Sequence, residues 1–357
     1  MMGRIVFADA LRGIAALSVL LAHYGLAFWT PGPTIGEIAN VPSVPPGVMP
    51  ELSHQALYAP PMTFSLAAFG VGLFFLISGF VIPLSIDRLD TVSFLYARAW
   101  RLGPTYAVGF VFTVAALAVA SHVYGKPFPY SRYEVIAHSV PGLRAFLGTR
   151  YIDYIVWTLE IELAFYALSA AMAPWLRRGA LLTFSAPVIV VLISLTLPLP
   201  DIYRVYGQSL ACMFVGVAFS FHHTGKLGSA AALALGLAVF SFSLWAVDFF
   251  SGFIYAASYA VATAVFCISY LARSIFPNLA PLRGLAAISY PLYVVHGIMG
   301  YVAMRIMLDH GIAPGLTVIL ALGLAVAVST TLHFGVEVPT QRIGKRLARP
   351  ASPAASA

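Results

Sequence analysis

The sequence has little charge. Asp, Glu, Lys and Arg make up only 9% of its 357 residues, whereas hydrophobic residues make up 60%. Because soluble domains carry about 25% charged residues, this composition excludes an ordinary soluble globular protein. It predicts an all-α, polytopic integral membrane protein, since apolar runs of about 20 residues have the length of a spanning helix.

Cysteine and several catalytic motifs are scarce or missing. The two cysteines, Cys212 and Cys267, fall inside apolar stretches, where a packing role is expected and a disulfide framework is not. No spacing such as H-E-x-x-H appears, so no metal is expected. The absence of G-x-S-x-G leaves a serine-hydrolase nucleophile without support.

About ten apolar stretches are long enough to cross a bilayer. They cover residues 5–28, 66–86, 102–122, 153–173, 180–198, 204–221, 228–247, 253–272, 287–308 and 315–336. We therefore expect about ten transmembrane helices, with an internal polar cavity, in a single domain over residues 1–350. The small-residue tail, residues 351–357, is expected to be disordered.

The basic residues predict the orientation of these spans. If the N-terminus is cytoplasmic, 14 of the 20 Lys and Arg residues fall on the cytoplasmic side, as the positive-inside rule requires. They are Arg4, Arg12, Arg88, Arg98, Arg101, Arg177, Arg178, Lys226, Arg273, Arg283, Arg342, Lys345, Arg346 and Arg349. Both termini are thus expected in the cytoplasm. The net charge of +7 then reflects topology, and no nucleic-acid partner is expected.

Arg12 and His23 both lie in the first apolar stretch. Eleven residues make close to three helical turns, so both side chains share one face, about 16 Å apart along the axis. Polar groups inside a span need a polar partner or a watery cavity. The first helix is therefore expected to face a polar interior, although His23 could simply bridge helices and Arg12 could be a snorkelling anchor.

Arg98 and Arg101 are spaced i, i+3 near the start of the third span. This spacing places two guanidiniums on one side of a helix, which suits a ligand with several phosphates. Juxtamembrane arginines that bind anionic lipid would show the same pattern.

Two further spans carry polar groups. Glu160 and Glu162 lie about 200° apart on a helix, so they cannot both face one cavity. Ser289, Tyr293 and His296 follow at i, i+4 and i+7, which predicts one polar stripe. The stripe is either a cavity wall or a set of hydrogen bonds between helices.

Six blocks occur in a fixed order along the chain: LRGIAALSVLLAH, GVGLFFLISGFVI, RAWRLGPTY, WTLEIELAFYAL, SYPLYVVH and VEVPTQRIGKRL. Together they resemble the acyltransferase-3 family of membrane O-acyltransferases, from about Asp9 to Arg346. The resemblance implies transfer of an acyl group, often acetyl, from cytosolic acyl-CoA to a hydroxyl. The acceptor would be a carbohydrate, a lipid-linked glycan or a similar envelope or secondary-metabolite molecule, handled among the lipids of the bacterial inner membrane.

The same resemblance implies roles for the polar residues. His23 would be the general base, which suits a side chain that titrates near neutrality, and Arg12 would belong to the active site. Arg98 and Arg101 would bind the donor. Glu162 fits the glutamate of the family pattern, whereas Glu160 occupies a position that is often serine. As a carboxylate does in hydrolytic triads, Glu162 would orient or charge-stabilise a histidine, either His23 or His296. The residues expected to complete the site or contact substrate are Trp157, Tyr166, Ser289, Tyr293 and His296.

An ion-coupled transporter is the main alternative, because intramembrane Arg, His and Glu also mark permeases. Paired discontinuous helices or an inverted repeat would favour it, and the sequence shows neither. A scaffolding or flippase-like subunit that holds an acyl carrier for a partner is a third possibility.

Overall fold

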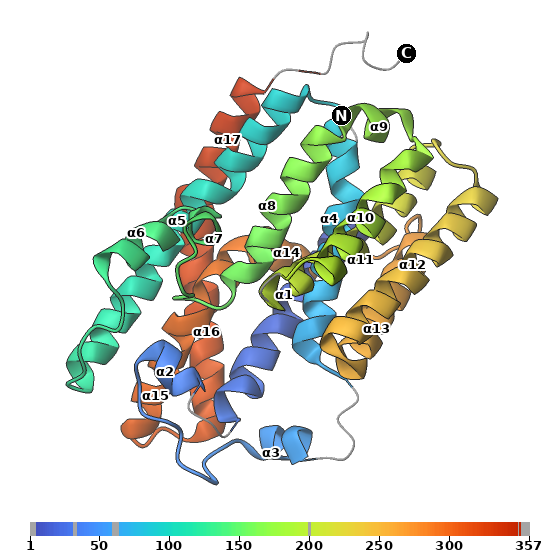
Figure 1. Ribbon diagram of the computed structural model, residues 1–357. Coiled ribbons are helices and arrows are strands. Elements are labelled where there is room, and N and C mark those ends of the chain that lie inside the picture. The colour runs from blue at the N-terminus through green and yellow to red at the C-terminus, as the bar shows by residue number, and fades with distance from the viewer. Residues whose placement is uncertain (1–4, 31–33, 59–63, 199–200, 349, 351–357) are drawn as a thin grey trace.

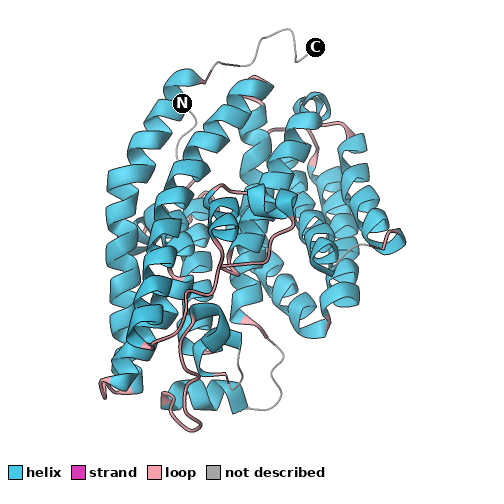
Figure 2. Ribbon diagram, turned by 60° about the vertical axis from the view of Figure 1, so that its left-hand side comes forward, coloured by secondary structure: helices cyan, strands magenta, loops and turns pink. Residues whose placement is uncertain are grey.

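A computed structural model describes residues 5–30, 34–58, 64–198, 201–348 and 350. The described residues form helices joined by loops and contain no β-strand, which confirms the all-α prediction (Figure 2). The tail, residues 351–357, lies outside the described residues, so its expected disorder stays a prediction.

The longer helices form the body of the molecule (Figure 1). They are α1 (Val6–Gly25), α4 (Leu66–Ile86), α5 (Thr91–Val123), α8 (Val156–Ala171), α10 (Ser185–Thr196), α11 (Asp201–His223), α12 (Ser229–Ser251), α13 (Phe253–Leu271), α14 (Ala280–Val295), α15 (Gly297–Asp309), α16 (Pro314–Leu332) and α17 (Val338–Leu347). The shorter helices are α2 (Thr34–Ala39), α3 (Glu51–Tyr58), α6 (Arg132–Ser139), α7 (Leu143–Leu147) and α9 (Ala173–Arg178).

The predicted count of ten spans is not confirmed. Within the described residues, seven helices are long and apolar enough to cross a membrane, or eight if α14 and α15 are one broken span. The stretches expected at 153–173 and 180–198 form only the 16-residue α8 and the 12-residue α10. At about 1.5 Å per residue, neither helix alone covers a hydrocarbon core of about 30 Å.

Helix α5 is longer than the predicted span at residues 102–122. Its 33 residues begin at Thr91, so Arg98 and Arg101 lie well inside the helix and not in a loop before it. The start of α5 lies beside α17 at the upper end of Figure 1. We call this the basic end, because the last turns of α9 and α17 there carry Arg177, Arg178, Lys345 and Arg346.

Helices α1, α4 and α11 pack in series through the centre of the bundle. Two glycines allow α4 and α11 to touch backbone to backbone: a Cβ on Gly79 would lie 1.8 Å from the Met213 carbonyl oxygen, and one on Gly216 would lie 2.2 Å from that of Leu76. Small residues allow this close approach between helices in a membrane. Helix α1 is therefore held in the centre, with α14 on its other side.

Candidate active site

A cavity lies between five helices, and we call it the cationic cavity. It is lined by Arg12 of α1, by Val71, Phe74, Phe75, Ser78, Val81 and Ile82 of α4, by Arg98, Arg101 and Leu102 of α5, by Thr158, Leu159, Glu162 and Tyr166 of α8, and by Ser289, Tyr290 and Tyr293 of α14. Three guanidiniums face one carboxylate, so the lining carries net positive charge.

The arginines of this cavity are only partly satisfied by the protein. Arg98 donates to Ser85 Oγ over 2.5 Å and lies over the rings of Phe94 and Tyr166. Nη1 of Arg12 lies 3.5 Å from Oδ1 of Asp9, three residues earlier on the same helix. The Nε atoms of Arg98 and Arg101 are buried and have no hydrogen-bond partner. A buried donor without a partner costs about 1–3 kcal/mol and more for a charged group, so these atoms favour an anionic ligand.

Glu162 projects into the cationic cavity, whereas Glu160 does not line it. Glu162 accepts hydrogen bonds from Tyr166, one turn later on the same helix, and from Ser78 Oγ over 3.4 Å. It makes no hydrogen bond to a histidine among the described residues, so its role in orienting or charge-stabilising His23 or His296 stays a prediction. Its neighbours are the arginines, with which it interacts electrostatically.

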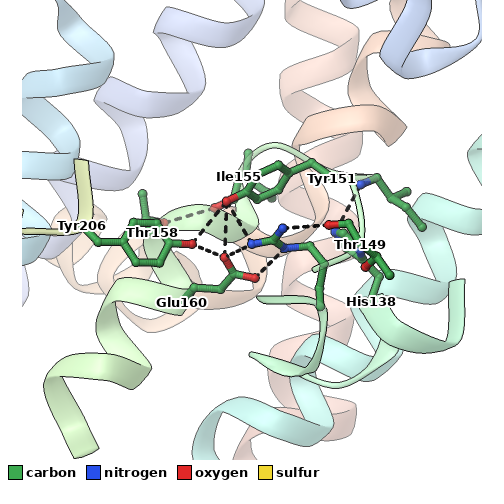
Figure 3. Close-up of polar contacts among 9 residues, drawn as sticks. His138, Thr149, Tyr151, Ile155, Thr158, Glu160 and Tyr206 are labelled. Atoms are coloured by element: carbon green, nitrogen blue, oxygen red, sulfur yellow. Dashed lines mark hydrogen bonds and ion pairs between the residues drawn. The ribbon is translucent and has the colours of Figure 1, made fainter. Parts of the chain in front are cut away.

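Glu160 belongs to a separate buried cluster (Figure 3). Arg144 of α7 grips both carboxylate oxygens, with Nε at 2.7 Å and Nη2 at 2.5 Å, and its guanidinium stacks 3.7 Å from the ring centroid of Tyr151. Tyr206 of α11 also donates to Glu160. These contacts hold the segment before α8 against α8 and α11. The role of Glu160 in this structure is therefore to stabilise the fold.

A row of polar contacts leads from the cavity toward the two histidines. Tyr293 lines the cavity, shares a 2.6 Å hydrogen bond with Thr158 Oγ1, and has its ring centroid 5.6 Å from that of His296. Ser289 also lines the cavity, but its hydroxyl donates to Ala286 of its own helix. The predicted stripe is therefore continuous, with Ser289 and Tyr293 on the cavity wall and His296 beyond them.

His23 and His296 form a pair of imidazoles. The ring centroids are 4.9 Å apart and the rings meet edge to face. The Nδ1 atom of His23 shares a 2.7 Å hydrogen bond with the hydroxyl of Tyr301. Neither histidine lines the cationic cavity, in keeping with the 16 Å expected between Arg12 and His23 on α1.

His296 stands where α14 ends and α15 begins, and the two helices meet there at 76°. Nδ1 of His296 lies 2.8 Å from the carbonyl oxygen of Tyr293 and 3.2 Å from that of Leu292, which also accepts from the backbone N–H of His296. Because a carbonyl only accepts, Nδ1 carries the proton. The Nε2 atom then carries an unprotonated lone pair, and it is buried without a hydrogen-bond partner. That arrangement is suited to accepting a proton.

Trp157 is not brought into the site. Its ring packs edge-on against Phe75, with centroids 6.4 Å apart, and it does not line the cavity. Sequence reasoning missed Tyr301, which contacts His23, and Ser78, which contacts Glu162. Neither carried a local signal, because each partner comes from a different helix. No group of three His, Cys, Asp or Glu side chains in the described chain could hold a metal ion.

The fold and the cavity define a polytopic membrane protein with a buried cationic site next to paired imidazoles. A family model described as an acyltransferase domain matches residues 5–334, nearly the whole chain, so the protein belongs to the acyltransferase-3 family. No curated protein and no solved structure shows significant similarity to the chain.

Proposed function

We propose that this protein is an O-acyltransferase that moves an acyl group, most simply acetyl, from acyl-CoA to a hydroxyl group. Family membership supports acyl transfer as the class of reaction. The observation that carries the donor assignment is the cationic cavity, where the buried Nε atoms of Arg98 and Arg101 lack partners. Forked guanidiniums bind phosphate oxygens well, and the nucleotide end of CoA carries several phosphates.

The separation between the arginines and the histidines fits a long carrier. Phosphates held by Arg98 and Arg101 would leave the thioester end of CoA to extend past Glu162 and Tyr293 toward His23 and His296. The distance of about 16 Å along α1 between Arg12 and His23 would be bridged by the flexible arm of the carrier. Arg12 and Glu162 would shape the wall along which this arm lies.

The chemistry then needs a base at the far end of the arm. An imidazole of the histidine pair accepts the proton of the acceptor hydroxyl, with His23 as the first candidate. The hydroxyl oxygen forms the new bond to the thioester carbonyl carbon, the carbon–sulfur bond breaks, and the proton passes to the departing CoA thiolate. Tyr301 would hold the His23 ring through Nδ1 during this exchange.

We also propose an orientation in the bacterial inner membrane. The ten expected spans would put 14 of the 20 basic residues on one side, so the basic end and both termini would face the cytoplasm, where acyl-CoA is made. A carbohydrate or lipid-linked glycan would be the acceptor at the histidine pair. A metal is not required by this scheme.

Purified protein incubated with labelled acetyl-CoA and extracted envelope lipids and glycans tests the proposal. We expect label in a product from which mild base releases acetate, as an ester requires. A His23→Ala protein prepared in parallel should give no labelled product. Retention of all label in acetyl-CoA, with every acceptor fraction tried, would overturn the assignment.

The broken helix at His296 favours a second candidate function. Ion-coupled transporters place substrate sites where helices are discontinuous, and α14 and α15 are discontinuous in the middle of this protein. Proteoliposomes separate the two functions. Uptake of a labelled glycan or acyl carrier without chemical change would favour a transporter, whereas a covalent ester favours the enzyme.

A further inference from the structure

Asp153 stands at the start of the expected span at residues 153–173, and the structure buries it. Its exposed fraction is 5%, and no Lys, Arg or His of the described chain forms an ion pair with it. A buried carboxylate without a cation is costly and calls for other stabilising contacts. Asp153 does not line the cationic cavity, so the donor site does not explain why this carboxylate is buried.

The contacts of Asp153 come from three separate elements. Oδ1 accepts from the backbone N–H of Ile155 over 3.2 Å, and Oδ2 lies 3.5 Å from Oγ1 of Thr113 on α5. The carboxylate also faces the start of α15, where it interacts with the backbone N–H of Ile298 in the first turn. The N-terminus of a helix carries free N–H groups and partial positive charge, so it stabilises a carboxylate placed there.

Gly297 leaves room for this contact. A Cβ added to Gly297 would lie 2.8 Å from Oδ1 and 3.0 Å from Oδ2 of Asp153. Only a residue without a side chain lets the carboxylate approach the start of α15 so closely. Gly297 directly follows His296, so the position of Asp153 and the geometry of the helix break are linked.

His296 is held from the other side as well. The hydroxyl of Tyr24 donates to the carbonyl oxygen of His296 over 2.7 Å, and Nδ1 of His296 is committed to the carbonyls of Tyr293 and Leu292. These bonds meet at the residue where the chain turns by 76°. The carbonyl oxygen of Leu292 also accepts from the backbone N–H of His296 over 3.2 Å, so it binds both the main chain and the ring of His296.

We propose that Asp153 is a positioning residue for His296, acting through the first turn of α15. By holding that turn against Thr113 and Ile155, it keeps the helix broken and the imidazole in its Nδ1–H form, with the Nε2 lone pair directed into the site. The kinetic part of this proposal rests on the proposed acyl transfer; the tautomer does not.

Two substitutions disturb this contact from opposite sides. In Asp153→Asn the side chain keeps its shape but has one acceptor oxygen where three donors converge. In Gly297→Ala the new methyl group displaces the carboxylate. Asp309→Asn is the matched control, because it neutralises a carboxylate at the far end of the same helix, where Asp309 pairs with Arg305.

The first readout is ¹⁵N NMR of protein labelled at histidine, with the His296 signals assigned from a His296→Gln spectrum. We expect one fixed Nδ1–H tautomer for His296 in the wild type and in Asp309→Asn. Both test variants should show a mixture of tautomers. An unchanged His296 signal in Asp153→Asn would overturn the proposal, whatever the protein turns out to catalyse.

The second readout is the kinetics of ester formation. We expect kcat to fall about tenfold to a hundredfold in each test variant, the cost of a small misplacement of a catalytic group. The KM for acyl-CoA should not change, because the cationic cavity is intact. The double variant should be no worse than the worse single one, as for two changes that break a single contact. Additive losses, or a raised KM with normal kcat, would contradict the positioning role. If the wild type forms no ester, the proposed function fails and the tautomer still decides this inference.

Discussion

His23 and His296 come from the first helix and from the break between α14 and α15, yet their rings meet edge to face with centroids 4.9 Å apart. Each ring has one nitrogen committed to a neighbour, Tyr301 for His23 and backbone carbonyls for His296. Nε2 of His296 has no hydrogen-bond partner, so it is the nitrogen of this ring that is free to accept a proton. The predictions below begin from this pair.

His23→Ala should abolish acyl transfer while the protein still folds and inserts, since the change removes a base and leaves an apolar residue in an apolar span. Tyr301→Phe should keep part of the activity, with a loss on the order of tenfold to a hundredfold in kcat, because Nδ1 of His23 loses its hydrogen bond to the Tyr301 hydroxyl. Rates at matched membrane expression, with size-exclusion profiles, check both. A His23→Ala protein with near wild-type kcat would rule out His23 as the base.

Arg98→Ala and Arg101→Ala should mainly raise the KM for acyl-CoA, because these side chains are assigned to donor binding. Arg98→Lys should restore little, since an ammonium lacks the planar fork. Arg342→Ala on α17 serves as a control for the loss of one positive charge near the basic end. A fall in kcat without any change in KM would move the two arginines from donor binding to catalysis.

Glu162→Gln should mainly lower the rate, whereas Glu160→Gln should mainly lower the stability of the fold. Glu162 faces the arginines of the cavity. The Glu162→Gln protein should therefore keep its fold, and its rate should fall on the order of tenfold to a thousandfold. Glu160→Gln leaves Arg144 buried without its counter-ion, a change that costs about 3–5 kcal/mol of stability in comparable sites. Its folded fraction should retain a rate within about tenfold of wild type. Melting temperature and kcat measured on the same samples decide the matter, and a greater loss of kcat in Glu160→Gln would reverse the two roles.

His138 on α6 should make stability depend on pH. Burial, and then the charge of Arg144, lower the pKa of His138 to about 4, and its Nε2 accepts from the backbone N–H of Ile152 over 3.2 Å. In an unfolded chain the pKa is about 6.5, so between pH 6.5 and 4 the unfolded state binds more protons. Stability should therefore fall as pH drops through this window.

The melting temperature of His138→Gln, measured against wild type from pH 7 to pH 4.5, checks this slope. The variant should lose part of the pH dependence, because its amide does not titrate. Stopping at pH 4.5 avoids Glu134, whose pKa the hydrogen bond from Arg150 lowers to about 2 and which therefore acts at lower pH. Parallel curves for the two proteins would show that His138 does not titrate on unfolding.

Cysteine labelling should place Arg88 and Lys126 on opposite sides of the membrane. These exposed residues flank α5, and they suit the test better than Asp90 or Ser131, whose side chains cap helices. Cys212 and Cys267 are first replaced by alanine. An impermeant thiol reagent added to intact cells should label Lys126→Cys only. Labelling of both positions would refute the proposed orientation.

The sequence predicts most of the helices, and it predicts those parts of the site that depend on spacing within a single helix. Contacts within one helix follow from spacing, so the Arg12–Asp9 pair and the shared face of Arg98 and Arg101 could be deduced. The separation of Glu160 from Glu162 follows from the same geometry, although the partner Arg144 does not. Local periodicity thus identified which groups face inward.

Contacts between distant helices were out of reach. Nothing near Asp153 in the chain indicates that it would meet the start of α15, because that meeting depends on a helix break at His296. The predicted span at 287–308 was continuous, since valine, leucine and isoleucine on both sides give no signal of a turn. The expected span at 153–173 also began too early: Asp153 accepts from the backbone N–H of Ile155, and α8 begins only at Val156.

The contact between Gly79 and Gly216 has a consequence for motion. With α4 seated backbone to backbone on α11, the wall of the cavity that carries Ser78 cannot slide without raising the energy of both helices. Helix α5 has no such seat against α4. When the cavity widens or narrows, we therefore expect the α5 wall, which bears Arg98 and Arg101, to move, and the α4 wall to stay in place.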